Sequence, residues 1–517
     1  MVAAGILLSR IIGLVRQRVF AHYFGTSAAA DAFWAAFRIP NLLQNLFGEG
    51  ALSASFIPVY AGLLARGEER AAQRVAGAVA ALLGLVIAVL VLAGVLATPL
   101  LIDLIAPGFE GATRELTIQL VRIFFPGAGL LVASAWCLGI LNSHRRFFLS
   151  YAAPVIWNIA IIAALVTWGG RVSLSELAMA AAWGSVVGSG LQFAVQVPTV
   201  LRVTGGVRPV VDLASAHVRE IGRSFVPAFF SRGAAQISAY VDTLIASLLP
   251  TGAVAALGYA QTLYMLPVSL FGMAISAAEL PAMASEQGSG EEVAAALQSR
   301  MNHGLRRIAF FVVPSAAAFL GIGHLVAGLI FQTGNFSAGE SRYVWAILAG
   351  AAVGLLAMTM GRLYSSAFFA LRDTRTPLRY ALVRVGLASV LGYVVAVHLP
   401  GRLGIEARWG AAGLTLTSGL VAWVELALLR RALGQRIGPT GVGGGYLARI
   451  WGAAAAGVAA GWGVESLAHA MRTPYLAALV IGTFGITYFA VAAALGVPEA
   501  RSFARRAGGR AGGGRAG

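Results

Sequence analysis

The chain has 517 residues, of which 58% are hydrophobic and 11% are charged, and its mean hydropathy is +0.79. Soluble domains carry about 25% charged residues, so this composition excludes an ordinary soluble protein and indicates a polytopic membrane protein. The net charge is +17, and all 38 basic residues are arginine. Because lysine is absent, the G-x-x-x-x-G-K-[ST] loop of ATP-driven motors is excluded. The single Cys137 excludes disulfides within the chain.

Continuous apolar windows predict an all-α fold with fourteen membrane-spanning helices, because backbone polar groups in the bilayer must be satisfied within the protein. These helices are expected near residues 2–24, 28–64, 74–106, 114–141, 148–169, 174–200, 220–249, 252–284, 303–332, 340–371, 377–398, 409–431, 446–469 and 474–496. The second and eighth are longer than a span needs and contain two prolines each, so we expect both to be kinked. The first run has no basic region before it, so we do not expect a cleaved signal peptide.

A weak internal repeat organises these helices. Ser9-Arg10 in the first helix recurs as Ser231-Arg232 in the seventh, and residues 141–158 resemble residues 371–387. The repeat predicts two six-helix lobes followed by two further helices. We therefore expect four regions, which are an N-lobe at 1–205, a C-lobe with its linker at 206–435, two helices at 436–500 and a basic disordered tail at 501–517.

The arginines between the predicted helices indicate the orientation of the chain. With the N-terminus inside, most of them fall on the cytoplasmic side. The outer side holds only Arg114, Arg171, Arg342, Arg402, Arg408 and Arg472. Cytoplasmic loops of membrane proteins carry the excess of positive charge, so both termini are predicted to be cytoplasmic.

Three arginines interrupt the first predicted helix, namely Arg10, Arg16 and Arg18. A single arginine at the bilayer centre costs at least about 2.5–3.5 kcal/mol. Arg10, Arg16 and Gln17 fall on one polar stripe of the helix, and most of the remaining surface is apolar, which is typical of a helix that lines a hydrated cavity. We interpret Arg18 as a side chain that reaches the outer interface.

The second helix carries complementary charges. Asp31 and Arg38 are seven residues apart and share a face, and Glu49 lies between two glycines. Asp31 is expected to line the polar site or to neutralise a buried arginine, and the two readings are compatible. Since a guanidinium keeps its charge and matches phosphate or carboxylate, the pattern indicates an anionic head group, as in a lipid-linked substrate.

The same residues resemble a known family. SRIIGLVRQRVFAHYFGTSAAADAFWAAFRIPNLL (9–43) and FGEGALSASFIPVY (47–60) closely resemble the amino-terminal signature of the MurJ (MviN) lipid II flippases, in the multidrug/oligosaccharidyl-lipid/polysaccharide exporter superfamily. Further similar segments are APGF (106–109), ILN (140–142), DTRTP (373–377) and RSFARR (501–506). The resemblance spans essentially the whole chain.

The resemblance implies a transporter in the bacterial cytoplasmic (inner) membrane, and not an enzyme. It would move undecaprenyl-diphosphate-linked peptidoglycan precursor (lipid II) to the outer leaflet by alternating access through a central cationic cavity. We expect a monomer with no cofactor, driven by membrane potential or a monovalent ion. Its expected partners are the lipid-linked anionic glycan, membrane lipids and proteins of peptidoglycan synthesis or division, and no nucleic acid. The alternatives are a flippase for an O-antigen or capsule glycan, a cation-coupled drug exporter and an assembly scaffold.

The chain departs from the family pattern at several charges. Gln17 replaces a usual acid, Gln44-Asn45 replaces a basic pair, and Thr262 replaces a usual arginine. Arg232 is expected either to supply the cation that Thr262 lacks or to pair with Asp242. The candidate substrate-binding residues are Arg10, Arg16, Asp31, Arg38, Glu49 and Arg232.

One candidate metal ligand also follows from the resemblance. Some relatives hold sodium through an acid that matches Asp242, which makes Asp242 the candidate sodium ligand here. We expect Arg384 to neutralise Asp242 instead, so that no sodium is bound.

Overall fold

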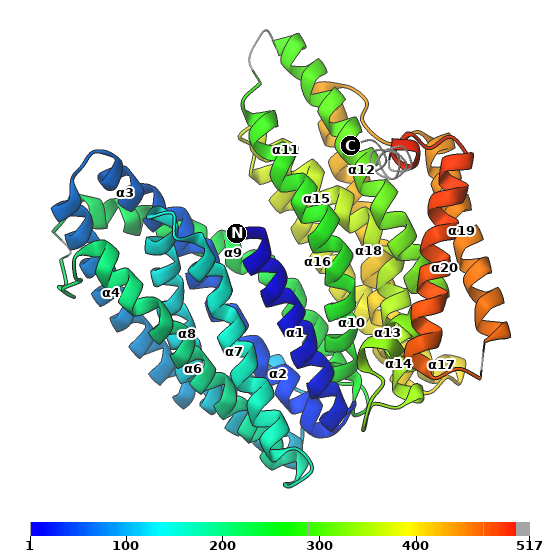
Figure 1. Cartoon of the computed structure of the whole chain (residues 1–517), viewed down its shortest axis with the longest axis horizontal. Helices are drawn as coiled ribbons and strands as arrows, with labels where there is room; N and C mark the ends of the chain where they lie inside the picture. The colour runs from blue at the N-terminus through cyan, green and yellow to red at the C-terminus, as the bar shows by residue number, and fades with distance from the viewer. Residues whose placement is uncertain (1, 213, 287–289, 469, 503–517) are drawn as a thin grey trace, which may run out of the picture. The chain divides into compact units, whose positions relative to one another are not determined.

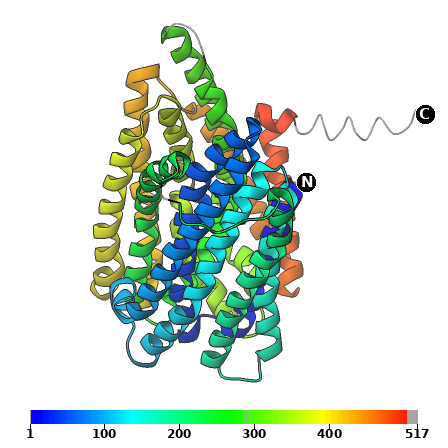
Figure 2. The same ribbon diagram turned by 90° about the vertical axis from the view of Figure 1, so that its left-hand side faces the viewer.

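The structure is a computed structural model that describes residues 2–212, 214–286, 290–468 and 470–502 (Figures 1 and 2). Within this part of the chain the regular elements are all helices, as expected. Contacts between Cα atoms divide the chain into two compact units. The first unit comprises Met1–Ala255 and Thr333–Phe336, and the second comprises Ala256–Gln332 and Ser337–Gly517.

The first unit contains the helices up to α9 and the start of α10. Its elements are α1 (Val2–Phe24), α2 (Ala28–Leu43), the π-helical segment η1 (Gln44–Leu52), α3 (Ser53–Ala65), α4 (Glu69–Leu96), α5 (Thr98–Ile105), α6 (Gly111–Ser143), α7 (Phe147–Trp168), α8 (Leu174–Thr204) and α9 (Ala216–Ser247).

The second unit contains most of α10 and the remaining helices. Its elements are α10 (Ala253–Pro267), η2 (Val268–Met273), α11 (Ala274–Ala284), α12 (Gly290–Gly321), α13 (Gly323–Phe331), α14 (Ala338–Val353), α15 (Leu355–Ala370), α16 (Arg375–Tyr393), η3 (Val394–His398), α17 (Leu399–Leu403), η4 (Ala407–Trp409), α18 (Gly410–Ile437), α19 (Gly444–Leu467) and α20 (Thr473–Ala494).

Every predicted helical range coincides with one helix or with a run of consecutive helices. Nine helices of the described chain are long and apolar enough to cross a membrane, or ten if the bent pair α14 and α15 counts as one span. The chain is therefore a multi-pass membrane protein, and the count of fourteen spans stays a prediction. Helix α1 falls outside the nine because it carries three arginines.

The two overlong predicted helices are both interrupted by π-helical segments. η1 separates α2 from α3, and η2 separates α10 from α11. π-helical turns shift the backbone ladder and are a known cause of helix bending. Pro267 is the last residue of α10, whereas Pro58 lies inside α3.

Small residues bring α7 and α8 close together. A Cβ atom on Gly184 would lie 2.7 Å from the Cβ of Ala164, and one on Gly188 would lie 2.9 Å from the Cβ of Ala160. The glycines and the alanines are each four residues apart, so they form a small-x-x-x-small contact between the two helices. This close packing fixes the position of Trp157, one turn before Ala160 in α7.

Buried polar side chains join α6 to α8. The amides of Gln192 and Gln196 donate to the hydroxyl of Ser134 at 2.9 and 2.7 Å. All three side chains are buried. Hydrogen bonds between helices satisfy polar groups that the hydrocarbon region leaves without water, so this network holds α6 and α8 in register.

Helix α9 packs in the first unit, and the expected lobe boundary at residues 205 and 206 stays a prediction. The ring of Phe47 in η1 lies 5.0 Å from that of Phe229 and 5.8 Å from that of Phe225, both in α9. The grouping follows from these aromatic contacts, which join residues distant in sequence.

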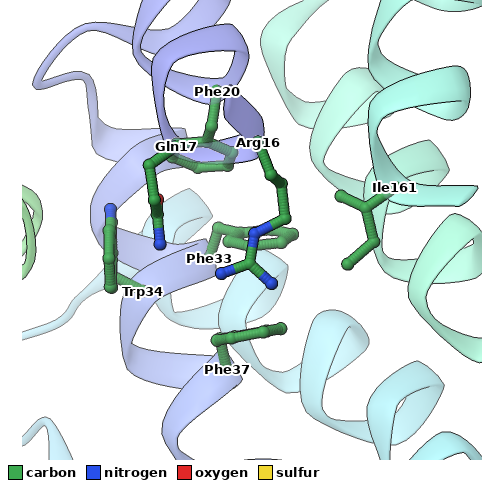
Figure 3. A pocket seen from close by; sticks show the side chains of 7 residues that line it. All are labelled: Arg16, Gln17, Phe20, Phe33, Trp34, Phe37 and Ile161. Carbon is green, nitrogen blue, oxygen red and sulfur yellow. The ribbon is translucent and has the colours of Figure 1, made fainter. Parts of the chain in front are cut away.

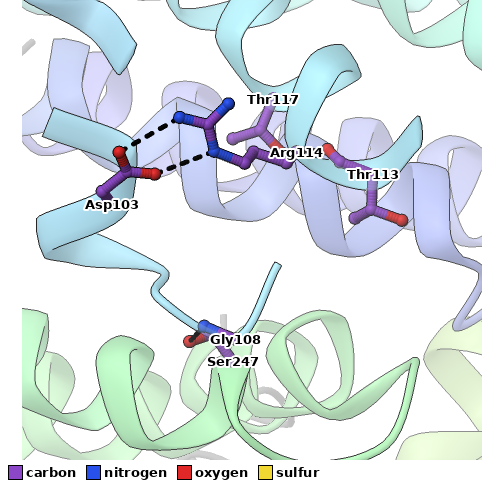
Figure 4. Close-up of polar contacts among 6 residues, drawn as sticks. All are labelled: Asp103, Gly108, Thr113, Arg114, Thr117 and Ser247. Atoms are coloured by element: carbon purple, nitrogen blue, oxygen red, sulfur yellow. Dashed lines mark hydrogen bonds and ion pairs between the residues drawn. The ribbon is translucent and has the colours of Figure 1, made fainter. Parts of the chain in front are cut away.

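A second contact places Gly108, in the APGF segment, against the end of α9 (Figure 4). The amide of Gly108 donates to the hydroxyl of Ser247 at 3.2 Å. A Cβ atom at Gly108 would lie 2.1 Å from the carbonyl oxygen of Ser247, so only glycine fits. Nearby, Arg114 donates to both oxygens of Asp103 at 2.8 and 3.1 Å.

Residues 333–336 belong to the first unit, although α13 and α14 on either side belong to the second. The amide of Asn335 donates to the carbonyl of His22 at 2.8 Å, and its side chain donates to the carbonyl of Tyr23 at 2.7 Å. The His22 ring is hydrogen-bonded to the hydroxyl of Thr333 at 2.9 Å. This short segment therefore covers the orphan carbonyls at the C-terminus of α1.

Candidate functional site

The polar stripe of α1 includes two arginines with different surroundings. Arg10 is exposed, whereas Arg16 is half-buried. Leu7 and Ile11, on the same half of the helix as Arg10, are 57% and 50% exposed. The two arginines of the predicted stripe therefore differ in burial. Only Arg16 lies among packed side chains.

The guanidinium of Arg16 lies against two aromatic rings. Its Cζ atom is 5.2 Å from the ring centroid of Phe37 and 5.0 Å from that of Trp157. These distances are within the range of cation–π attraction, which is worth about 2 kcal/mol when the cation is desolvated. The rings stabilise the charge but accept no conventional hydrogen bond from the guanidinium.

A small cavity adjoins this guanidinium (Figure 3). Its volume is about 10 Å³, close to the space that one water molecule requires. Its lining residues are Arg16, Gln17, Phe20, Phe33, Trp34, Phe37 and Ile161. The Nη1 atom of Arg16 is buried and has no hydrogen-bond partner in the described part of the chain. A buried donor of this kind is costly unless a ligand or water accepts its hydrogen bond, so the site is suited to an anionic oxygen.

The two rings beside Arg16 are themselves fixed. Phe37 and Trp157 are stacked with centroids 5.6 Å apart and planes 12° apart. The indole N–H of Trp157 donates to the hydroxyl of Ser185 at 3.0 Å and also contacts its carbonyl oxygen. Helices α2, α7 and α8 thus preorganise the surroundings of a charge that α1 provides.

The carboxylate of Asp31 is hydrogen-bonded to backbone amides at the start of α10. Its carboxylate accepts hydrogen bonds from the amides of Gly252 at 2.5 Å and Ala255 at 2.7 Å. The side chain is 3% exposed. These amides belong to the start of α10, where orphan N–H groups and the helix dipole favour a negative charge. Both oxygens are therefore engaged, and the carboxylate caps α10 instead of neutralising an arginine of α1.

The part of α9 around Tyr240 packs against α2 at Arg38. The hydroxyl of Tyr240 donates to the carbonyl of Arg38 at 3.1 Å. Asp242, two residues further along α9, lies within electrostatic range of the Arg38 guanidinium. Sequence reasoning did not identify this proximity.

Arg384 has another partner than the one expected. Its Nε atom lies 2.8 Å from an oxygen of Glu425 in α18, and both side chains are largely buried. Arg362 lies within electrostatic range of both groups. Arg384 thus pairs with Glu425 inside the second unit, and the expected neutralisation of Asp242, which belongs to the first unit, stays a prediction.

Two other predicted site residues, Glu49 and Arg232, have side chains outside the described part of the structure. Their proposed contacts with substrate stay predictions. Within the described residues, no group of three or more His, Cys, Asp or Glu side chains is placed to hold a metal ion. The role of Asp242 as a sodium ligand likewise stays a prediction.

Sequence reasoning missed the aromatic residues around Arg16. Phe37 lies directly before Arg38 in the FRIP segment, and Trp157 lies in the repeated segment at 141–158. An isolated aromatic residue in a membrane helix has no distinctive pattern, and only the packing of α1, α2 and α7 shows that the two rings meet. Arg16 and Phe37 lie in consecutive helices joined by a short turn, so the sequence does predict that α1 and α2 are neighbours. It does not predict which side chains of the two helices are in contact.

Solved structures of two transporters share the fold of this chain. A solved structure described as "Lipid II flippase MurJ, inward closed conformation" matches with a TM-score of 0.76 at 21% identity, covering 95% of this chain and 97% of that one. A multidrug resistance MATE family transporter of the MOP superfamily, in an inward-facing conformation, matches with a TM-score of 0.66 at 16% identity, covering 83% of this chain and 95% of that one.

Sequence comparison defines the family. The family profile described as "Lipid II flippase MurJ" matches residues 20–483. The lipid II flippase MurJ of Burkholderia cenocepacia is 32% identical over 438 residues, covering 83% of this chain and 82% of the relative. The probable lipid II flippase MurJ of Haemophilus influenzae is 29% identical, with 83% and 84% covered. The chain therefore belongs to the MurJ family of lipid II flippases, as its amino-terminal signature predicted.

Proposed function

We propose that this chain moves lipid II, the undecaprenyl-diphosphate-linked peptidoglycan precursor, from the cytoplasmic to the outer leaflet of the bacterial inner membrane by alternating access. Its family membership and the names of its relatives support this proposal. The observation that carries it is the buried Nη1 atom of Arg16, which has no hydrogen-bond partner among the described residues and borders a cavity. A diphosphate oxygen is an acceptor that would satisfy this donor and its charge.

In this proposal the protein acts as a monomer, requires no cofactor and catalyses no covalent step. Both termini are cytoplasmic, which the distribution of arginines supports. Membrane potential is the proposed driving force, because no P-loop lysine is present to support ATP hydrolysis. Proteins of peptidoglycan synthesis or division are the proposed neighbours that make and use the substrate.

The test is complementation in a bacterium depleted of its own lipid II flippase. The wild-type chain should restore growth and cell shape, and Arg16→Gln should fail at equal abundance in the membrane. Arg171→Gln, which removes an exposed arginine from the turn between α7 and α8, is the matched control and should rescue fully. Rescue by Arg16→Gln would contradict the role of this guanidinium.

A second candidate substrate is another polyprenyl-diphosphate-linked glycan. It is favoured by Gln17, which lines the cavity, and by Thr262, whose hydroxyl donates to the carbonyl of Gly258 in its own helix. Both residues are neutral where relatives usually carry a charge. Failure of a well-expressed wild-type chain to rescue, together with transport of an O-antigen or capsule lipid intermediate, would establish this alternative.

A further inference from the structure

The outward face of α18 in the second unit carries a continuous apolar stripe. Leu416, Leu420, Trp423 and Ala427 follow each other at spacings of four, three and four residues, which places them on one side of the helix. Leu420 is 53% exposed and Trp423 is 40% exposed. In a multi-pass membrane protein, such a stripe faces lipid chains.

This stripe leads into a cavity at the C-terminal end of α18. The cavity volume is about 390 Å³, within the range of sites for small ligands. Its lining residues are Trp423, Leu426, Ala427, Arg430, Arg431, Gly434, Pro439 and Thr440. One end is thus apolar, and the other carries two positive charges about 10 Å further along the helix.

The two arginines of this cavity lack an acidic partner. Within the described chain, no carboxylate forms an ion pair with Arg430 or Arg431, whereas nearby Arg436 pairs with Asp373 at 2.6 Å. Arg430 and Arg431 are both exposed, and the Nη2 atom of Arg430 lies beside Gly441, where a Cβ atom would be only 2.9 Å away. The cavity therefore presents uncompensated positive charge.

The remaining walls are also fixed. The indole N–H of Trp423 donates to the carbonyl of Val353 at 2.9 Å, so the ring is anchored to α14. The hydroxyl of Thr440, which is buried, is hydrogen-bonded to that of Tyr364 at 3.1 Å. Gly434 leaves open space, because a Cβ atom there would meet nothing within 4 Å.

We propose that this cavity binds one anionic phospholipid of the inner leaflet. The phosphodiester group contacts Arg430 and Arg431, and one acyl chain lies along Ala427, Trp423 and Leu420. Basic pockets beside membrane helices on the cytoplasmic side are suited to such head groups, and aromatic rings at this level anchor the boundary between head group and chain. The site takes a resident lipid and is separate from the Arg16 site.

The test measures phosphatidylglycerol bound to the purified full-length protein by native mass spectrometry, with phosphatidylcholine as the neutral reference. One arginine near an anionic lipid surface contributes about fivefold in affinity, so Arg430→Gln and Arg431→Gln should each weaken phosphatidylglycerol binding about fivefold. The double variant should lose more than fivefold and up to about 25-fold, because adjacent arginines that contact one phosphate group do not act independently. Binding of phosphatidylcholine should not change.

Two controls separate the cavity from general surface charge. Gly434→Leu fills the open space without changing charge and should weaken phosphatidylglycerol binding at least fivefold, whereas Gly434→Ala should retain it. Arg449→Gln removes an exposed arginine from the nearby start of α19 and should have less than a twofold effect. Thermal midpoints of all variants are compared, so that loss of folding is recognised directly.

Three outcomes would overturn the proposal. They are equal affinity for phosphatidylglycerol and phosphatidylcholine in the wild type, an effect of Arg449→Gln as large as that of Arg430→Gln, and unchanged binding in Gly434→Leu. In a further arm, 10-fold excess inorganic phosphate is added over the lipid. Retained lipid binding supports the proposal, and full displacement would show that the cavity is a site for free phosphate.

Discussion

Arg16 in the first unit and Arg384 in the second are both arginines within apolar helices, but their charges are compensated differently. Arg384 has a carboxylate of Glu425 at 2.8 Å. Arg16 has the ring faces of Phe37 and Trp157, and one of its buried nitrogens has no hydrogen-bond partner in the described chain. The Nε atom of Arg384 likewise lacks a hydrogen bond of good geometry in the described chain, so the difference between the two arginines lies in their charge. The Arg384–Glu425 pair compensates its own charge, whereas a charge that lies only against aromatic rings can still bind an anion. The comparison distinguishes an arginine that supports the fold from one that is available to a substrate.

The largest expected effect is a loss of stability, and it comes from breaking the ion pair between Arg384 and Glu425. Glu425→Leu leaves Arg384 buried without its partner and should lower the free energy of unfolding by about 3–5 kcal/mol. The double variant Arg384→Met with Glu425→Leu should restore most of this loss, because an apolar pair of similar volume avoids the desolvation of both charges. Thermal unfolding in detergent provides the measurement. If the double variant were as unstable as Glu425→Leu alone, the two side chains would contribute to stability through more than the compensation of each other's charge.

Asp31, like Arg384, has its charge stabilised within the protein, because both of its oxygens accept backbone hydrogen bonds. Asp31→Ala should cost about 3 kcal/mol in the free energy of unfolding, since it removes two hydrogen bonds to a charged group and leaves buried donors. Asp31→Asn retains one acceptor and should cost about half as much. The matched readout is again the thermal midpoint. If both variants unfold like the wild type but fail in complementation, Asp31 contacts substrate and does not cap α10.

Arg16 should show the opposite behaviour. Arg16→Met should change the free energy of unfolding by less than about 1 kcal/mol, because the lost cation–π attraction is offset by the removal of a desolvated charge. Transport should fall about 10–100-fold, the equivalent of one hydrogen bond to a charged group. Reconstituted flipping of fluorescent lipid II measures the rate. A fall in stability without a fall in transport would show that Arg16, like Arg384, supports the fold and does not bind substrate.

How much of this could be predicted from sequence depends on the range of the interaction. The apolar runs located the helices, and the run at 2–24 coincides with α1. The arginines also identified the family and the stripe of α1. The partner of Asp31 could not be predicted, because it consists of backbone amides more than 200 residues away that carry no side-chain signal. The grouping of α9 and the contact of residues 333–336 with α1 likewise depend on packing between distant segments.

The support of Arg16 by its rings can be tested through α7 and α8. Gly188→Ala introduces a Cβ atom 2.9 Å from the carbonyl oxygen of Trp157, so α7 must move. Such overpacking typically costs about 1–3 kcal/mol, and here it should also displace the Trp157 ring from Arg16. Gly190→Ala is the control, because its nearest neighbour, Leu130, would lie at an ordinary 3.8 Å. We expect reduced stability and transport for Gly188→Ala only, and equal behaviour of the two variants would contradict the close packing.

The smallest expected effect concerns the ion pair between Arg436 and Asp373, which lies outside the membrane helices. Acid can break this pair by protonating the carboxylate. Hydrogen bonds from the amide and hydroxyl of Thr376, followed by the Arg436 guanidinium, lower the pKa of Asp373 to about 2. Because this pKa is lower in the folded state than in the unfolded chain, the carboxylate contributes stability above about pH 4, and this contribution is lost as pH falls towards 2. Asp373→Asn should remove this part of the acid sensitivity and leave stability at pH 7 slightly lower than that of the wild type. Thermal midpoints of both proteins between pH 7 and pH 3 test the sign. A difference that grows as the pH falls would contradict the assignment, since protonation should make the two proteins alike.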